Sequence, residues 1–125
     1  MSTNAVILLF TLLLLKHALA DLNLQGRLKG NDMSKFPVFS DKNALHSLDH
    51  AALSLLVTVI FAPLWLAALL ATAEFFVHYL IDFSKTRIKV ALNIGVKDRA
   101  FWKLQGYDQM AHMLTYAAMV TIIAN

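Results

Sequence analysis

The stretch that decides the fold is EFFVHYLIDFSK, residues 74–85, which closes a long apolar run that begins at Pro63. Three of its ionisable residues, Glu74, His78 and Asp82, are spaced four apart, so a helix places them in one stripe. Charged side chains at the end of a lipid-soluble helix are costly unless other groups pair with them. The rest of the chain therefore has to supply partners for this stripe.

The composition is that of a membrane domain. The chain has 125 residues, of which 58% are hydrophobic and 15% charged, and the apolar residues gather in long blocks. It has no cysteine, which excludes disulfides and thiolate ligands, so any metal would be bound by nitrogen and oxygen. The net charge is +3. Because the Lys and Arg residues flank apolar segments, they fit topology signals better than a nucleic-acid surface, and we expect no nucleic-acid partner.

Four apolar segments predict an all-α fold, an antiparallel four-helix bundle integral to the membrane, with a single domain over residues 1–125. The predicted helices cover about 4–25, 43–61, 63–85 and 107–124, and the polar connections cover 26–42 and 86–106. At ~1.5 Å per residue, the first helix would span about 30 Å, the thickness of a bilayer core.

The first apolar segment also has features of a secretory signal peptide, with a cleavage-like ALA motif at residues 18–20. Two features oppose cleavage: no Lys or Arg precedes the apolar run, and Lys16 lies next to the cleavage region. In addition, His17, Asp21 and Gln25 form a single helical stripe that continues past the cut. We therefore expect this segment to be retained as the first membrane helix.

The positive charges predict the orientation. All Lys and Arg residues except Lys16 fall in, or at the edge of, two segments, 26–43 and 85–106. The positive-inside rule makes both connections cytoplasmic, so that the termini and the short turn at residues 62–63 face outward. The expected location is the bacterial inner membrane, as a multi-pass protein.

Each predicted helix carries His or Asp residues four apart near the same membrane face. Residues at this spacing can share one metal ion, and facing helices can complete its coordination. Zinc is the expected ion, because it suits imidazole and carboxylate ligands, and iron or manganese would also fit. The predicted ligands are His17, Asp21, His46, His50, His78, Asp82, Asp108 and His112.

A metal ion at this face could lower the pKa of a bound water to ~7 and so generate a nucleophile. Glu74 or Asp49 could then act as the general base, and the sequence does not choose between them. Lys85 could hold an anionic group such as a lipid phosphate, or neutralise Asp82. The polar partners expected between helices are Gln25 and Gln109.

Four motifs in this order resemble a family of small polytopic membrane proteins of unknown function from bacteria and phages. The motifs are HxxxDxxxQ at 17–25, HxxxH at 46–50, HxxxDxxK at 78–85 and DQxxH at 108–112. One departure is Leu22, where family members often have an aromatic residue. The resemblance implies a retained first helix and a phage or bacterial inner-membrane home, and it implies no established activity.

The leading functional hypothesis is a metal-dependent hydrolase that acts on a lipid-linked or amphipathic substrate. The alternative is a non-enzymatic accessory protein, such as a holin-like protein, a superinfection-blocking protein or a subunit of a complex. A second alternative is a proton or ion pathway, and the same polar residues could also form a metal-free network. The expected partners are the lipid bilayer and further membrane-protein chains, either copies of this one or other subunits.

Overall fold

The computed structural model describes residues 1–24 and 41–125, and these residues form an all-α fold without strands. The helices are α1 (Thr3–Leu19), its short π-helical continuation η1 (Ala20–Leu24), α2 (Asp41–Thr58), α3 (Leu64–Ala91) and α4 (Arg99–Ala124). The predicted all-α class is therefore confirmed. Gln25 and nearly all of the predicted 26–42 connection lie outside the described residues.

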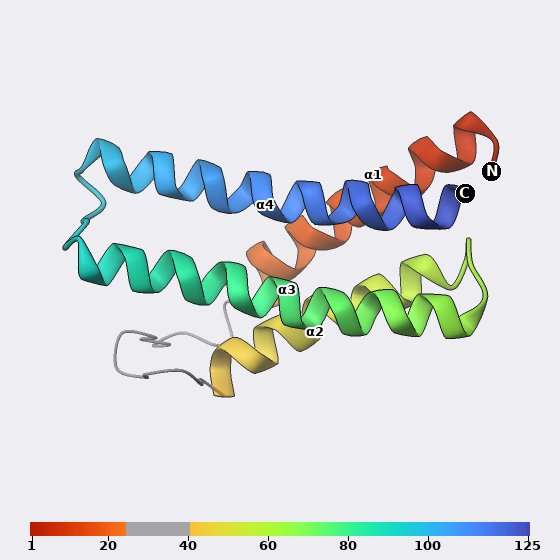
Figure 1. Ribbon diagram of the computed structural model, residues 1–125, viewed down its shortest axis with the longest axis horizontal. Helices are drawn as coiled ribbons and strands as arrows, with labels where there is room; N and C mark the ends of the chain where they lie inside the picture. The colour runs from red at the N-terminus through yellow and green to blue at the C-terminus, as the bar shows by residue number, and fades with distance from the viewer. Residues whose placement is uncertain (25–40) are drawn as a thin grey trace.

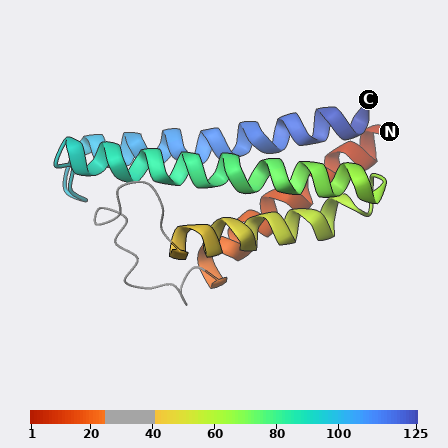
Figure 2. The ribbon, with the colours of Figure 1, turned by 60° about the horizontal axis from the view of Figure 1, so that its bottom comes forward.

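The four long helices form a bundle in which α3 and α4 run side by side in opposite directions (Figure 1). Helix α2 packs mainly against α3, and α1 packs against both α2 and α4. Both termini lie at the same end as the α2–α3 turn, and the α3–α4 turn lies at the opposite end (Figures 1 and 2). The backbone at Met1 reaches that of Ala124, with an N···O distance of 3.4 Å.

Helices α3 and α4 are longer than the sequence predicted. The sequence predicted a connection at 86–106, but α3 continues to Ala91 and α4 already begins at Arg99. Gly106, expected to end that connection, lies inside α4, where an added Cβ would meet no atom within 4 Å. A glycine inside a helix costs about 1 kcal/mol relative to alanine, which is too little to interrupt a helix that packs along its length.

The turn between α3 and α4 is closed by local hydrogen bonds. Asn93 has a positive φ of 49°, a conformation that asparagine tolerates better than most residues. The N–H of Ile94 donates to the carbonyl of Lys89 at 2.9 Å and so ends α3. The carboxylate of Asp98 then accepts the N–H of Gly95 at 2.6 Å before α4 begins.

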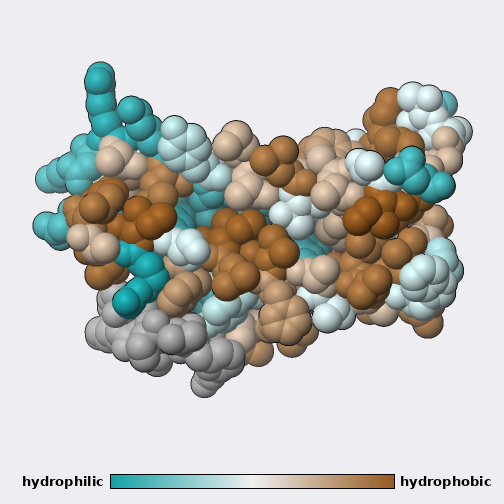
Figure 3. Space-filling model, viewed as in Figure 1, coloured by the Kyte–Doolittle hydropathy of each residue, from teal (hydrophilic) through white to brown (hydrophobic). Residues whose placement is uncertain are grey.

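The interior has an apolar layer near the termini and a polar layer toward the α3–α4 turn. The apolar layer consists of Leu9, Leu13, Leu70, Tyr116, Met119 and Val120. In the polar layer the buried side chains include histidine, aspartate, glutamate and lysine, together with an asparagine and a serine of α2. Large apolar residues instead cover much of the outer surface, and hydrophilic residues gather at the end with the α3–α4 turn (Figure 3).

Two helical segments are long and apolar enough to cross a membrane, Thr3–Leu24 and Leu64–Ala91. They correspond to the first and third predicted membrane helices. Helices α2 and α4 do not reach this threshold within the described part of the chain. Helix α2 buries His46 and His50, and α4 buries Asp108 and His112, which lowers the average hydropathy of both helices.

Candidate metal centre

All four helices contribute to one cluster of imidazoles in the polar layer of the bundle. The five histidines of the chain are buried, although they come from α1, α2, α3 and α4. The ring of His78 lies between two others, with centroid distances of 3.8 Å to His50 and 4.2 Å to His112. His46 and His17 lie next to His50, at 4.6 Å and 4.9 Å. The stripes that the sequence placed on separate helices therefore meet.

Asp21 faces three of these imidazoles. Its carboxylate oxygens lie 3.1 Å from Nε2 of His50, 3.2 Å from Nε2 of His17 and 3.4 Å from Nε2 of His46. Asp21 lies in the π-helical turn η1, and turns of this rare type often occur at functional sites. This carboxylate thereby joins the imidazoles of α1 to those of α2.

Asp82 has the same role on the other side of the cluster. Its oxygens lie 3.3 Å from Nε2 of His78, 3.4 Å from Nε2 of His112 and 3.7 Å from Nε2 of His46. Lys85, one turn further along α3, is 3.7 Å away through its ammonium nitrogen. Asp82 therefore connects imidazoles of α2, α3 and α4.

Asp108 completes the carboxylates of the cluster. Its Oδ2 forms an ion pair with Lys85 Nζ at 2.9 Å and accepts a hydrogen bond from Gln109 Nε2 at 3.3 Å. Its Oδ1 is buried and has no hydrogen-bond partner within the described residues. Gln109 also reaches the imidazole of His17, at 3.1 Å through its Oε1 atom.

The side chains form four sets of three whose ligand atoms lie within 4.8 Å of one another. The sets are His17/His50/His78, Asp21/His46/His50, His46/His78/Asp82 and Asp82/Asp108/His112. The second and fourth sets share no residue, so the cluster has enough ligands for two ions. Three protein ligands with one open position is the usual arrangement of a catalytic zinc.

The donor atoms of the cluster fit a cation. Buried polar atoms normally have a hydrogen-bond partner, and each exception needs an explanation. Both ring nitrogens of His78 are buried without such a partner among the described residues, because the 3.3 Å approach of Nε2 to Asp82 lacks hydrogen-bond geometry. A cation would give His78 Nε2 and Asp108 Oδ1, which lies 3.7 Å from His112 Nε2, a closer partner. Both atoms are metal ligands in their deprotonated form.

A small polar cavity of about 80 Å³ opens at these ligands. Its lining includes all three aspartates of the cluster, two of the histidines and Lys85. The cavity has room for a water or a small polar group, because a water molecule takes up roughly 30 Å³ in the liquid. The ligands therefore face a space in which a reacting group could approach.

The family model described as "Protein of unknown function (DUF3307)" matches residues 9–125. The chain belongs to this family. The match confirms the expectation of a family of unknown function and reaches beyond the segment that carries the four motifs. Comparisons with curated proteins and with solved structures gave no match.

In this DUF3307 protein, Lys16 belongs to the polar layer, and Tyr116 of the apolar layer borders it. The sequence left open whether Lys16 enters the site or lies toward the membrane interface, and it did not single out Tyr116. Lys16 forms a buried ion pair with Glu74, donates to the backbone carbonyl of His50 at 3.1 Å and lies 4.5 Å from the centre of the Tyr116 ring. The Tyr116 hydroxyl is 2.8 Å from Nδ1 of His17. Lys16 therefore points into the bundle and not toward a membrane surface.

The position of Tyr116 was readable from the sequence. It follows Asp108 and His112 at the next four-residue step, so α4 carries a three-residue stripe like the one on α3. A tyrosine in an apolar segment usually indicates packing, so the sequence alone did not point to a contact with the imidazole cluster. A buried tyrosine hydroxyl nevertheless normally has a hydrogen-bond partner, and here that partner is an imidazole of the cluster.

The two candidate general bases lie outside the four ligand sets. Glu74 is one turn deeper than His78 and pairs with Lys16. Asp49 is half-buried on α2, between the two histidines of that helix in sequence. Their catalytic roles stay predictions. The eight predicted ligands, Lys85 and Gln109 all lie at the cluster.

Proposed function

We propose that this DUF3307 protein is an integral membrane protein that binds one or two divalent metal ions and uses them to hydrolyse an amphipathic substrate. Zinc is the best match to the imidazole and carboxylate ligands, and iron and manganese are the alternatives. The observation that carries the proposal is the meeting of five imidazoles and three carboxylates, from four helices, in one buried layer.

The distribution of polarity supports a membrane location for all four helices. In a water-soluble bundle the apolar faces point inward, whereas large contiguous apolar surfaces mark membrane or partner contact. Here α2 exposes Leu45, Leu48 and Leu56, while its histidines are buried. Helix α4 likewise exposes Leu114 and Ile122. The low average hydropathy of α2 and α4 thus comes from their inward faces.

Threonine side chains within the helices also suit a lipid environment. Hydroxyl groups need internal partners where water is absent. The hydroxyls of Thr11, Thr72, Thr115 and Thr121 each donate to the carbonyl four residues earlier, at 2.8–3.0 Å. These hydroxyl groups therefore need no water as a hydrogen-bond partner on the outer surface of the bundle.

The basic residues support a cytoplasmic position for the metal centre. The 28 residues of α3 extend for about 42 Å, which exceeds the ~30 Å core of a bilayer. The surplus length of α3 and α4 carries lysines and arginines at the end with the α3–α4 turn. By the positive-inside rule this end faces the cytoplasm of a bacterial cell.

The polar cavity supports a hydrolytic role. A divalent ion held by these residues would supply an acidified water and would polarise the oxygen of a carbonyl or phosphoryl group. Contacts between neighbouring side chains fix the geometry around the cavity. Gln109, for example, contacts both Asp108 and His17. Lys85 provides a positive charge at the cavity edge, where a negatively charged substrate group would enter.

The test is elemental analysis of protein purified in detergent without chelator. We expect one or two equivalents of a transition metal in the wild type and loss of this metal in the His78→Ala/Asp82→Ala double variant. The matched control is Asp98→Ala, which removes an aspartate in the α3–α4 turn and should retain the metal. Metal-free wild type, or a double variant with a full complement, would refute the metal centre and favour a non-enzymatic membrane protein.

A further inference from the structure

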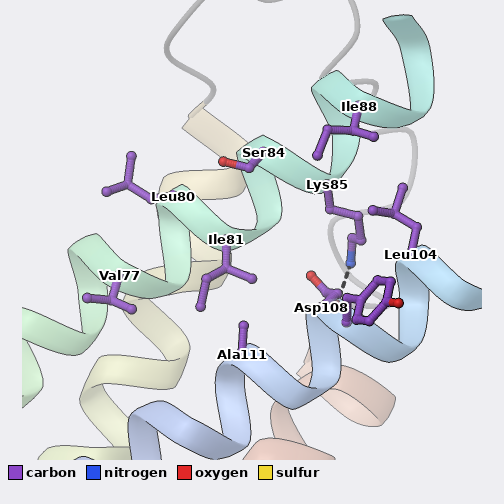
Figure 4. A pocket seen from close by; sticks show the side chains of 10 residues that line it. Val77, Leu80, Ile81, Ser84, Lys85, Ile88, Leu104, Asp108 and Ala111 are labelled. Atoms are coloured by element: carbon purple, nitrogen blue, oxygen red, sulfur yellow. Dashed lines mark hydrogen bonds and ion pairs between the residues drawn. The ribbon is translucent and has the colours of Figure 1, made fainter. Parts of the chain in front are cut away.

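An apolar groove lies between α3 and α4, with a volume of about 360 Å³. Its walls are mainly aliphatic, and Ile81 of α3 faces Ala111 of α4 across its floor (Figure 4). Leu80, Ile88 and Leu104 contribute further apolar surface. On a bundle that spans a membrane, such a groove between two outer helix faces opens to the lipid.

One end of this groove is polar and joins the metal centre. Lys85 and Asp108 line both the groove and the polar cavity beside the histidines. Figure 4 shows the Lys85 side chain reaching across to Asp108, to which it is bound at 2.9 Å. The lysine side chain remains about one-quarter exposed. The apolar groove therefore ends at an ammonium group, that of Lys85, and at a candidate metal ligand, Asp108.

We propose that this groove binds an acyl chain of a lipid whose headgroup carries a phosphate, and that Lys85 holds the phosphate beside the metal centre. The proposal rests on the proposed function, for which it names the substrate class. The aliphatic walls match the acyl chain, and the ammonium group matches the phosphate. An ammonium has three donors. Within the described residues, Lys85 Nζ donates to Asp108 at 2.9 Å and lies 3.7 Å from Asp82.

A second groove provides an internal comparison. It lies between α2 and α3, has a volume of about 450 Å³ and is lined by residues such as Leu48, Leu55, Ala68 and Phe76. None of its lining residues is charged. It could hold a lipid chain without regard to the headgroup. Of these two grooves, the one between α3 and α4 combines apolar walls with a basic end.

The experiment measures binding of dihexanoyl phosphatidic acid to the full chain in a maltoside detergent by isothermal titration calorimetry. Inorganic phosphate and dihexanoyl glycerol are the two comparison probes, because they carry the phosphate and the chains separately. Ala111→Phe fills the α3–α4 groove, Lys85→Met removes its charge, and Ala68→Phe fills the α2–α3 groove as the matched control. Metal content and thermal unfolding are measured on every preparation.

We expect wild-type protein to bind phosphatidic acid about tenfold or more tightly than either comparison probe, because both parts of the lipid contribute. Ala111→Phe and Lys85→Met should each weaken this binding by about tenfold, whereas Ala68→Phe should leave it unchanged. Wild-type affinity in folded Ala111→Phe, or equal weakening by Ala68→Phe, would overturn the proposal, since binding would then be general partitioning into apolar surface. Equal affinity for inorganic phosphate would overturn it as well.

The two proposals fail in different ways. Protein without metal, but with lipid binding that depends on Ala111 and Lys85, would refute the metal centre and support the groove. Protein that holds metal, but binds lipid independently of these residues, would refute the groove alone.

Discussion

The buried ion pair between Lys16 and Glu74 gives a quantitative test of the polar layer. Only 3% of the lysine side chain and 1% of the glutamate side chain are exposed. Removing one partner of a buried pair costs about 3–5 kcal/mol, because the other charge is left uncompensated. Replacing both partners by apolar residues of similar volume is often neutral, or stabilising by about 1–4 kcal/mol.

The surroundings of each charge set where in this range each variant falls. In Lys16→Met, the Glu74 carboxylate loses its ion pair, and its second oxygen already has no hydrogen-bond partner within the described residues. We expect a loss near 5 kcal/mol in the free energy of unfolding. In Glu74→Met, the ammonium keeps the carbonyl of His50 and the ring of Tyr116, so a loss of about 3 kcal/mol is expected.

The assay is reversible denaturant unfolding in mixed micelles, with both single variants and the Lys16→Met/Glu74→Met double variant. The double variant should be no more than about 1 kcal/mol less stable than the wild type. Lys89→Met, at an exposed position of α3, is the control and should change stability by less than about 0.5 kcal/mol. Single losses below about 1 kcal/mol, or a double loss equal to the sum of both, would refute the buried, charged pair.

Three further predictions concern the site, the fold and the topology. Tyr116→Phe removes the hydroxyl that orients His17 and should lower metal affinity by about 10–100-fold, measured by competition with a chelator; unchanged affinity would exclude this orienting role. Gly106→Ala should raise the free energy of unfolding by about 1 kcal/mol, since α4 runs through this position with open space around it, and a decrease would contradict a continuous helix. Because the chain has no cysteine, Val96→Cys and Asn125→Cys can be labelled in intact cells with an impermeant maleimide. The label should reach only Asn125→Cys, and the reverse pattern would invert the proposed orientation.

The candidate ligands could be predicted because their positions follow from the regular geometry of helices and antiparallel bundles. Residues four apart on a helix share a face, and an antiparallel bundle with short turns brings alternate helix ends together. These two rules place His46 and His50 opposite His78 without any knowledge of side-chain contacts. All eight predicted ligands accordingly appear in the four sets.

The partners of the cluster could not be predicted because they depend on helix rotation. Lys16 is adjacent in sequence to His17 and carries the charge of an ordinary topology signal, yet the packing of α1 against α2 turns it toward the backbone of His50. The ends of α3 and α4 were missed for a related reason. Their polar sequence has the composition of a loop, but the two helices support each other where they run side by side beyond α1 and α2 (Figure 2).

The net charge of the polar layer suits a divalent cation. Four carboxylates and two lysines meet there, which leaves two negative charges when the imidazoles are neutral. Two protonated imidazoles would also restore neutrality if they were rings that are not neighbours, because like charges on adjacent rings, 3.8–4.9 Å apart, disfavour each other. One divalent ion would restore neutrality with every imidazole neutral, since a metal binds the lone pair of a neutral imidazole. With a second ion, the layer would have a net charge of about +2. A phosphate dianion at Lys85 would balance this charge.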